Sequence, residues 1–506
     1  MAKYKHYDYS QKVLVPVSLE EQLMPGTLEF AIHTLVETRI DMSVFEHRYN
    51  NDETGRWAYD PKILLKIVLL GYARGLISSR KIERACGENV TFMALTCEQC
   101  PDHSTIAAFV SSMHEEIVPL FRDVLLVCEE EGLLGGTFFA LDGCKLPSNA
   151  SREWSGKIAN LSKKKGKIEK KVAQLLEAQV DADKREKDNG KTQHCSESLD
   201  RAKQAEQLQK KAERIEQWLQ ENGPKMGKKG TEINSNITDN ESAMMVGSHG
   251  VIQGYNGQIL VDGKRQVVVH GEAFGCGEEH DLIPPMLEGA KENIEAIGQR
   301  EDYFKGKPFT ADSNYHSPTN LKKCEEQEVD AYIPDKRFRK RALKERLKGA
   351  YRSRRKGRFG LEDFQHNEAS DEYVCPAGKV LKCCAKEAHV DGIIYRRYRA
   401  KGTYCVSCEL RTKCIMGLRT KQRHLNVPIG SAPGNLTKAM AKKIDTEQGR
   451  RIYNQRIAIV EPVFANIRFQ KRMDRFTLRG KAKVSIQWLL YCMVHNIEKI
   501  KGYCFA

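Results

Sequence analysis

The sequence predicts an α/β protein with a helical N-terminal domain, and three observations indicate it. Apolar residues recur at helical spacing up to about residue 131. Short apolar runs typical of strands then begin at Thr137 and alternate with a helical stretch, Leu282 to Ile297. Two charged stretches, 157–224 and 336–436, interrupt this second part. A length of 506 residues exceeds what one hydrophobic core usually serves, which fits several structural units.

The first unit, residues 1–131, is predicted to consist of short helices. A helix that starts near Ile63 should stop at Gly75, and Ser78 or Ser79 can cap the next helix. Short helices joined by tight turns are typical of a helix-turn-helix DNA-binding unit and equally of an ordinary helical cap domain. The pattern alone favours neither.

The second unit, residues 132–500, is predicted to be an α/β core. The run from Thr137 to Leu141 ends in Asp142 and Gly143, which indicates a buried strand that reaches a turn. Further strands are expected at four short apolar runs: Gly257–Val261, Gln266–His270, Pro308–Ala311 and Asp330–Ile333.

The first insertion, 157–224, predicts an antiparallel helical hairpin. Leu161, Ile168 and Val172 follow three- and four-residue steps, and residues Leu208 to Leu219 repeat the pattern. The polar stretch Asp181–Ser198 should connect the two arms. DNA contact, dimerisation and decoration without a role are all compatible with such a hairpin.

The second insertion, 336–436, predicts a basic unit that contains cysteines. Its first part, Lys336 to Arg358, includes Arg354 and Arg355 and has aromatic residues between its basic ones, as a surface that follows a phosphate backbone requires. A solvated charged segment is the alternative. The net charge of +15 favours a nucleic-acid partner, although an anionic membrane surface would also attract it.

Four cysteines of this insertion are candidate metal ligands. Cys405 and Cys408 are separated by two residues, and Cys414 with Cys375 can complete four thiolates around one tetrahedral Zn²⁺. The sixteen cysteines are spread through a chain without a signal sequence, which indicates a cytoplasmic protein with reduced thiols. We expect a structural zinc site that braces the insertion. A group of reduced, buried thiols is the alternative.

Three acids are candidate ligands of divalent metal ions. Asp142 and Asp312 each end a strand-like run, and Glu461 lies in a helical stretch near the C-terminus. Hard cations bind carboxylate oxygens, and two ions about 3.5 to 4 Å apart can activate a nucleophile and stabilise the leaving oxygen of a phosphodiester. Taken singly, each acid is better explained as a turn residue or a surface charge.

The residues around these acids resemble a known family. The segment Tyr453–Arg468 resembles the Tyr-Arg-Glu-Lys signature of bacterial insertion-sequence DDE transposases, with Arg in place of the final Lys. Four residues separate Arg456 from Glu461, one more than is usual for the motif. Phe138–Ser151 resembles the first-aspartate motif and Thr310–Ser317 the second. The resemblance points to insertion-sequence family eleven-eighty-two.

The resemblance implies a ribonuclease-H-like catalytic core after a helical DNA-binding domain. Asp142, Asp312 and Glu461 would hold two Mg²⁺ or Mn²⁺ ions. Water would attack a phosphodiester at the element's end, and the released 3′ hydroxyl would then attack target DNA. The partner would be double-stranded DNA, both terminal inverted repeats and target, bound by a homodimer or larger assembly at the nucleoid. No membrane partner is expected, since no run of apolar residues is long enough to span a bilayer.

The signature's other residues are expected to hold the DNA backbone. Arg468, and also Tyr453 and Arg456, would contact phosphates. Glu461 and Arg468 are seven residues apart, which makes about two helical turns, so they should face one groove. Pro462 predicts a kink or a helix start, because the residue before a proline disfavours helical conformation.

Two other functions share part of this pattern. A metal-dependent DNA nuclease without strand transfer would have the same acids. A non-enzymatic, zinc-containing DNA-binding protein would explain the basic charge and the cysteines, but it leaves the ordered acidic motifs unexplained. The transposase interpretation accounts for all of these features together.

Overall fold

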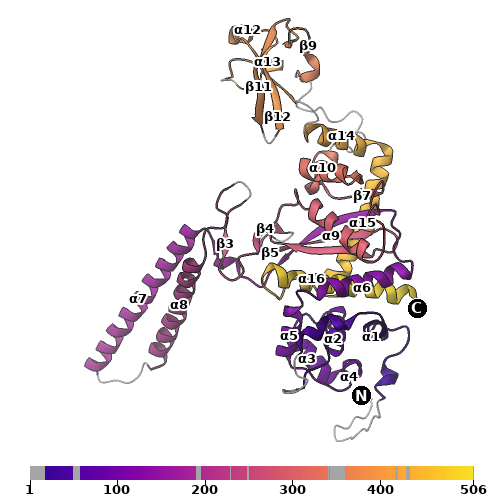
Figure 1. The fold of residues 1–506 in the computed structure, drawn as a ribbon. Helices are drawn as coiled ribbons and strands as arrows, with labels where there is room; N and C mark the ends of the chain where they lie inside the picture. The colour runs from indigo at the N-terminus through magenta and orange to yellow at the C-terminus, as the bar shows by residue number, and fades with distance from the viewer. Residues whose placement is uncertain are drawn as a thin grey trace, which may run out of the picture.

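The fold is taken from a computed structural model, which describes residues 18–49, 57–189, 195–227, 230–247, 250–339, 341, 359–390, 393–415, 417, 420–428 and 433–504. Figure 1 shows a central body from which a helical hairpin and a small β-rich module project. None of the helices in the described ranges combines the length and the apolar character that a membrane span needs.

Helices α1 to α6 precede the first strand. Their bounds are α1 Leu28–Thr38, α2 Pro61–Ala73, α3 Ser79–Glu88, α4 Val90–Thr96, α5 His103–Ser112 and α6 Ile117–Glu130, with 3₁₀ turns at η1 Glu20–Gln22 and η2 Met42–Arg48. The predicted stop after α2 is confirmed, since the helix ends at Ala73 and Gly75 has a φ of +72°. Ser78 directly precedes α3, although its side chain makes no capping hydrogen bond.

The central sheet has the strand order β4-β5-β1-β7-β8, and β6 also pairs with β5. The strands are β1 Phe139–Pro147, β4 Ala243–Gly247, β5 Gly250–Asp262, β6 Val268–Phe274, β7 Pro308–Thr310 and β8 Asp330–Tyr332. β1 is antiparallel to β5 and parallel to β7, which is parallel to β8. Helices α9 (Ile283–Ala296) and α10 (Pro318–Glu326) connect the later strands. All four further strands that the sequence predicts are present.

The predicted turn at Asp142 is wrong. β1 continues to Pro147, and Gly143 pairs with Gln258 in the middle of the strand. Glycine is required here for space, because a Cβ atom at Gly143 would lie 1.9 Å from Nε2 of Gln258. An Asp-Gly pair is typical of turns, but in this strand the neighbouring side chain occupies the volume that the glycine leaves free.

The last helix joins the N-terminal helices to the sheet. α16 (Lys481–Cys504) stacks Tyr491 on Tyr72 of α2, with 4.6 Å between the ring centroids. On the sheet side, Nε1 of Trp488 donates to the carbonyl of Gln258 at 2.8 Å, and the amide of Asn496 exchanges two hydrogen bonds with the backbone of Val268. One hydrophobic core therefore runs from the N-terminal helices through α16 into the sheet.

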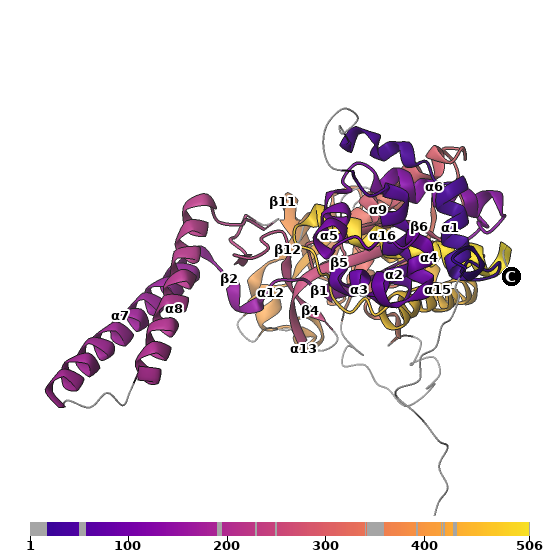
Figure 2. The same ribbon diagram turned by 90° about the horizontal axis from the view of Figure 1, so that it is seen from below.

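The first insertion is a helical hairpin, as predicted. Helices α7 (Ile158–Asn189) and α8 (Cys195–Glu221) pack against each other and project from the sheet, as Figures 1 and 2 show. Short strands β2 (Ser155–Gly156) and β3 (Ser235–Asn236) pair at its base, after the turn η3 (Arg152–Trp154). The stretch Asp181–Ser198, predicted to connect the arms, is largely helical, because α7 extends to Asn189 and α8 begins at Cys195.

The second insertion contains a small β-rich unit, residues 359–428, which we call the cysteine module. Its sheet has the order β13-β12-β11-β10-β9. The elements are η5 Leu361–Asp363, β9 Gln365–Asn367, β10 Glu372–Val374, β11 Val380–Val390, β12 Ile393–Ala400, α12 Gly402–Val406, α13 Arg411–Cys414 and β13 His424–Pro428. The predicted basic run lies mostly outside the described residues, and so do Arg354 and Arg355.

Two helices return the chain to the sheet: α14 (Pro433–Asp445) and α15 (Glu447–Ala465). The predicted helix start at Pro462 is wrong, since α15 runs through this residue and continues into a π-helix, η6 (Asn466–Gln470). Pro462 has no N–H for the carbonyl of Ala458. That carbonyl instead accepts a hydrogen bond from Nε2 of Gln266 at 2.9 Å, so the helix tolerates the proline.

Candidate active site

Asp142 and Asp312 occupy matching positions on neighbouring parallel strands. In the pairing of β1 with β7, Ala140 lies opposite Thr310, and each aspartate follows two residues later. Parallel strands end at the same edge of a sheet, so the register brings the two carboxylates to one place. The sequence predicted that each acid ends a strand: Asp312 does follow β7, whereas Asp142 lies within β1, and the register of the two strands accounts for their proximity.

Asp142 is held by an arginine on α15. Nη1 of Arg456 donates to Oδ2 of Asp142 at 2.7 Å, and the side chains are only 10% and 21% exposed. Burial raises the pKa of Asp142, and the charge of Asp312 adds to this rise, whereas Arg456 and the N–H of Gly143 oppose it. The guanidinium thus supplies positive charge that opposes the effect of burial on this carboxylate.

Asp312 follows β7 and begins the 3₁₀ turn η4 (Ser313–Tyr315). Its Oδ1 accepts a hydrogen bond from the backbone N–H of Asn314 at 2.6 Å. The side chain of the residue is partly exposed, so it lies at the rim of the sheet and not inside the core. A carboxylate that is fixed by a backbone N–H and open to solvent has oxygen lone pairs free for a ligand.

Glu461 lies on α15, the helix that packs across β1 and β7. Arg456, Val460 and Val463 face the sheet and are buried, whereas Glu461 is exposed. Five residues after Arg456, Glu461 is rotated about 140° around a regular helix. Within the described ranges, no three His, Cys, Asp or Glu side chains are grouped so that they could hold a metal ion. The structure brings Asp142 and Asp312 together and sets Glu461 on the adjacent helix, with its carboxylate turned to solvent.

The three signature residues expected to contact DNA, Tyr453, Arg456 and Arg468, lie in different environments. Arg456 points inward to Asp142, and Tyr453 packs edge-on against Phe338, with ring centroids 5.4 Å apart. Arg468 lies in the π-helix and is partly buried. The expectation that Glu461 and Arg468 share a face assumed a regular α-helix, and the π-helical turn removes the basis for it.

A further acid near Asp312, Glu279, was not predicted from the sequence. It lies between β6 and α9, is 6% exposed and accepts a hydrogen bond from Nδ2 of Asn256 at 3.0 Å. Burial raises the pKa of Glu279, and Asp312 adds to the rise. Oδ1 of Asn256 and Nε2 of Gln258 are buried beside Gly143 without a hydrogen-bond partner among the described residues. The signal that could have indicated this region is the pair of polar residues Asn256 and Gln258 at alternate positions of β5, since buried polar side chains are uncommon in a strand.

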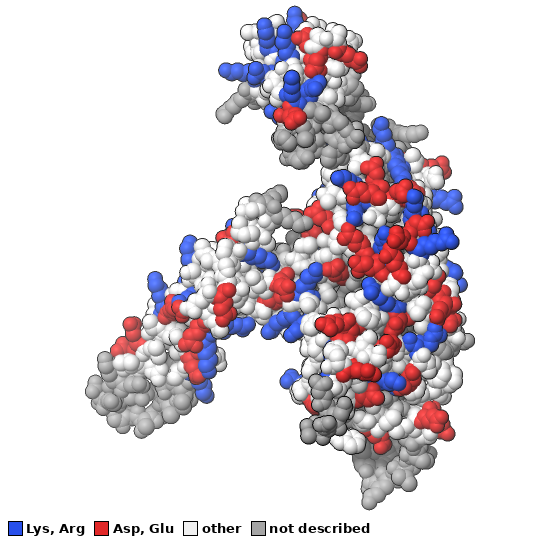
Figure 3. Space-filling view, in the orientation of Figure 1, with Lys and Arg blue, Asp and Glu red and all other residues white. Residues whose placement is uncertain are grey.

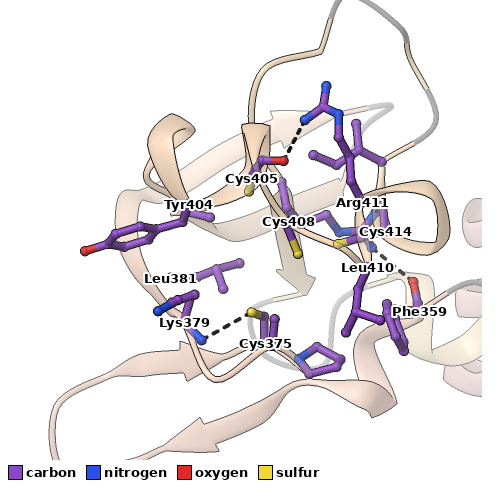
Figure 4. A pocket seen from close by; sticks show the side chains of 15 residues that line it. Phe359, Cys375, Lys379, Leu381, Tyr404, Cys405, Cys408, Leu410, Arg411 and Cys414 are labelled. Carbon is purple, nitrogen blue, oxygen red and sulfur yellow. Dashed lines mark hydrogen bonds between the residues drawn. The ribbon is translucent and has the colours of Figure 1, made fainter.

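A second group of candidate ligands lies in the cysteine module. Cys375, Cys405, Cys408 and Cys414 line a single pocket between the sheet and the two short helices, as Figure 4 shows. The sequence predicted that these four residues would share one site. They line the same pocket although 29 residues lie between Cys375 and Cys405, but among the described residues their side chains are not grouped closely enough to hold a metal ion as they stand.

Comparison with known proteins finds two family models along the chain. A family described as "Transposase DDE domain" matches residues 374–501, and a family described as "Transposase domain" matches residues 17–112. The first match contains Glu461 and the four cysteines, and the second covers most of the N-terminal helices. Asp142 and Asp312 lie between the two matches. No curated protein and no solved structure matches the chain.

Proposed function

We propose that Asp142, Asp312 and Glu461 are the catalytic acids of this chain. The chain is a bacterial insertion-sequence DDE transposase and hence an enzyme that acts on DNA. The matching positions of Asp142 and Asp312 on β1 and β7 carry the proposal. Glu461 is assigned as the third acid because it lies on α15, which packs across these strands, and within the segment that resembles the family's signature.

The strand order supports a ribonuclease-H-like core. Strands β6, β5 and β1 are antiparallel neighbours, and β7 and β8 follow β1 in parallel. In this proposal the core comprises residues 132–500, the hairpin (157–224) and the basic, cysteine-containing segment (336–436) are insertions into it, and residues 1–131 form the DNA-binding domain.

The donor set fits two divalent ions such as Mg²⁺ or Mn²⁺. Carboxylate oxygens are the ligands that hard cations prefer, and two bound ions would activate the attacking oxygen and stabilise the leaving one. Asp142 is already paired with a cation, the guanidinium of Arg456. Arg456 is therefore assigned as a positioning residue, which fixes the direction of the Asp142 carboxylate and favours its charged form.

The reaction proposed is hydrolysis at the element's end followed by strand transfer into target DNA. Arg468 and Tyr453, together with the basic run that contains Arg354 and Arg355, are proposed to hold the DNA backbone. Two ends must meet for the transfer, so we propose a homodimer or larger assembly. The alternative activity is DNA cleavage without joining, which would use the same acids.

The test is a reaction of purified protein and Mg²⁺ with a labelled duplex that carries the terminal repeat and with a supercoiled target. Wild type is compared with Glu461→Gln and with Glu447→Gln, an exposed glutamate in the first turn of the same helix. Joined products from wild type and Glu447→Gln, but not from Glu461→Gln, are expected. Cleavage without joining in wild type would favour the nuclease, and DNA binding without strand breakage would contradict a catalytic role for the acids.

A further inference from the structure

The pocket of the cysteine module is built from three separate segments. Cys375 lies in the turn that follows β10, Cys405 lies in α12 with Cys408 just after it, and Cys414 ends α13. Figure 4 shows their sulfur atoms on the walls of one pocket, with Leu381 of β11 behind them. Two short helices and a turn are thus held against the sheet around the pocket that the four cysteines line.

The turn at Cys375 is shaped around its sulfur. The N–H of Gly378 donates to the carbonyl of Cys375 at 2.8 Å, and Gly378 has a φ of +70°. This tight turn lets the N–H of Lys379 donate to Sγ of Cys375 at 3.4 Å. A neutral thiol is a weak acceptor, whereas a thiolate is a strong one, so the backbone N–H suits an ionised sulfur.

Positive charge surrounds the remaining cysteines. Nη1 of Arg411 donates to the carbonyl of Cys405, and Nη1 of Arg423 donates to the carbonyl of Cys414, both at 2.9 Å. Four thiolates around one Zn²⁺ carry a net charge of −2, which these two guanidinium groups can offset.

The module also needs a stabilising element beyond its core. Its buried hydrophobic cluster consists of six residues: Phe364, Tyr373, Leu381, Tyr398, Ala400 and Leu425. A unit of this size rarely folds on such a core without a metal or a disulfide. The described cysteines are all free thiols, so a metal is the remaining means of cross-linking them.

The outer face of the module's sheet carries basic side chains. Lys382, Arg399 and His424 are cross-strand neighbours on β11, β12 and β13. Side chains alternate along a strand, so these residues lie on the face opposite Leu381 and Ala400, which line the pocket. Glu372 on β10 offsets part of this charge, since its Oε1 lies 3.4 Å from Nζ of Lys382. In Figure 3, Lys and Arg side chains gather on the upper left of the module, while Asp and Glu gather on the visible face of the core.

We propose that Cys375, Cys405, Cys408 and Cys414 bind one structural Zn²⁺, which ties α12, α13 and the Cys375 turn to the sheet. Binding requires each thiol to lose its proton and to turn into the pocket that it already lines. The site is independent of the catalytic acids, because its ligands are sulfur atoms, which select zinc over Mg²⁺. Cys384 is exposed on β11, does not line the pocket and is excluded from the site.

The test is zinc content per chain of full-length protein, purified under reducing conditions from cells supplied with zinc. Wild type is compared with Cys408→Ser, with the control Cys384→Ser from the same module, and with Asp312→Asn. One zinc per chain is expected in wild type, Cys384→Ser and Asp312→Asn, and a loss of at least tenfold in zinc affinity is expected in Cys408→Ser. Equal zinc content in Cys408→Ser and wild type, or no zinc in wild type, would overturn the proposal.

A second measurement guards against misfolding of the variant. Hydrogen exchange of wild-type protein is followed by mass spectrometry before and after a zinc chelator is added. Removal of zinc should speed exchange in residues 393–415 and leave β1, β5 and α16 unchanged. Faster exchange throughout the chain, or unchanged exchange in the module, would contradict the assignment. Neither result depends on transposition activity, so failure of the zinc site and failure of the proposed catalytic acids remain distinguishable.

Discussion

The central body and the cysteine module reach stability in different ways. In the central body, α16 joins the N-terminal helices to the sheet, and a single hydrophobic core extends through both. In the module, six buried hydrophobic residues support five strands, and four thiols gather at the loops. Burial of apolar area stabilises the large unit, whereas the small unit depends on particular polar contacts and on the metal ion that we propose.

This difference predicts how much of the structure a destabilising substitution affects. A destabilising change in the central body should affect the helices and the sheet together, because they share a core. A change in the module should remain local, since its buried hydrophobic cluster is separate from the core of the central body. The following predictions test this contrast.

The largest effect is expected for Asp312→Asn, which should abolish DNA cleavage without changing the stability of either unit. If Asp312 binds a catalytic metal ion as proposed, its loss removes several kcal/mol of transition-state stabilisation, which corresponds to at least about a thousandfold loss of rate. Cleavage rate and thermal unfolding are measured for this variant and for Asp302→Asn, an exposed aspartate away from the site. Equal loss of cleavage, DNA binding and stability would mean that Asp312 is structural.

The next effect is expected for Arg456→Gln, which leaves the carboxylate of Asp142 buried without its partner. We expect the free energy of unfolding in metal-free buffer to fall by about 3 kcal/mol. The helices and the sheet should unfold together at the lower denaturant concentration. The exposed Arg451 on the same helix provides the control Arg451→Gln. If Asp142 binds a metal ion, Mg²⁺ should stabilise Arg456→Gln more than wild type, and no such difference would argue against Asp142 as a ligand.

A smaller effect on stability is expected from His495, a buried residue of α16. Nε2 of His495 lies 2.8 Å from the carbonyl oxygen of Gln266, and Nδ1 lies 3.1 Å from Oδ1 of Asn466, so the neutral ring can donate to one of these two acceptors. Burial lowers the pKa of His495 to about 3. The neutral ring is favoured in the folded state, so its contribution is complete above pH 6.5 and is lost as pH falls towards 3. At pH 5 the loss is about 2 kcal/mol.

This prediction is measured as the difference in unfolding free energy between pH 7.5 and pH 5. His495→Gln, whose amide can keep one of the hydrogen bonds, should show a smaller difference than wild type. The module, which does not contact His495, should show the same pH dependence in both proteins. An unchanged difference in His495→Gln would place the acid sensitivity on other groups.

The smallest effect is expected for Tyr398→Phe in the module. The hydroxyl of Tyr398 donates to Oδ1 of Asp371 at 2.5 Å, and Asp371 is 42% exposed. Loss of this hydrogen bond should cost about 1 kcal/mol. Local hydrogen exchange should increase in β10 to β13 only, with Tyr395→Phe on the same strand as the control. Faster exchange in the central sheet would show that the two units are more tightly coupled than their cores suggest.

Much of the architecture was predictable from local pattern. The strands after Asp142, the helical hairpin and the helix at Leu282 follow from the period of their apolar residues. The four cysteines could also be grouped, because the spacing of Cys405 and Cys408 is typical of two ligands of one metal ion. Local pattern is informative where a residue's role depends on its near neighbours in sequence.

The remaining features depend on contacts between distant segments. Gly143 looked like a turn residue because its function, leaving room for Gln258, involves a strand more than a hundred residues away. Pro462 looked like a helix start because nothing nearby reveals that Gln266 satisfies the carbonyl of Ala458. Arg456 was expected at DNA, whereas its partner is Asp142, 314 positions earlier.

The position of α16 in the chain has a consequence for the timing of protein synthesis. Domains generally fold as the ribosome releases them, from the N-terminus onward. Here the N-terminal helices and the sheet both lack part of their core until residues 481–504 have emerged. A nascent or prematurely terminated chain would therefore have an incomplete core both in its N-terminal helices and in the sheet that carries Asp142 and Asp312.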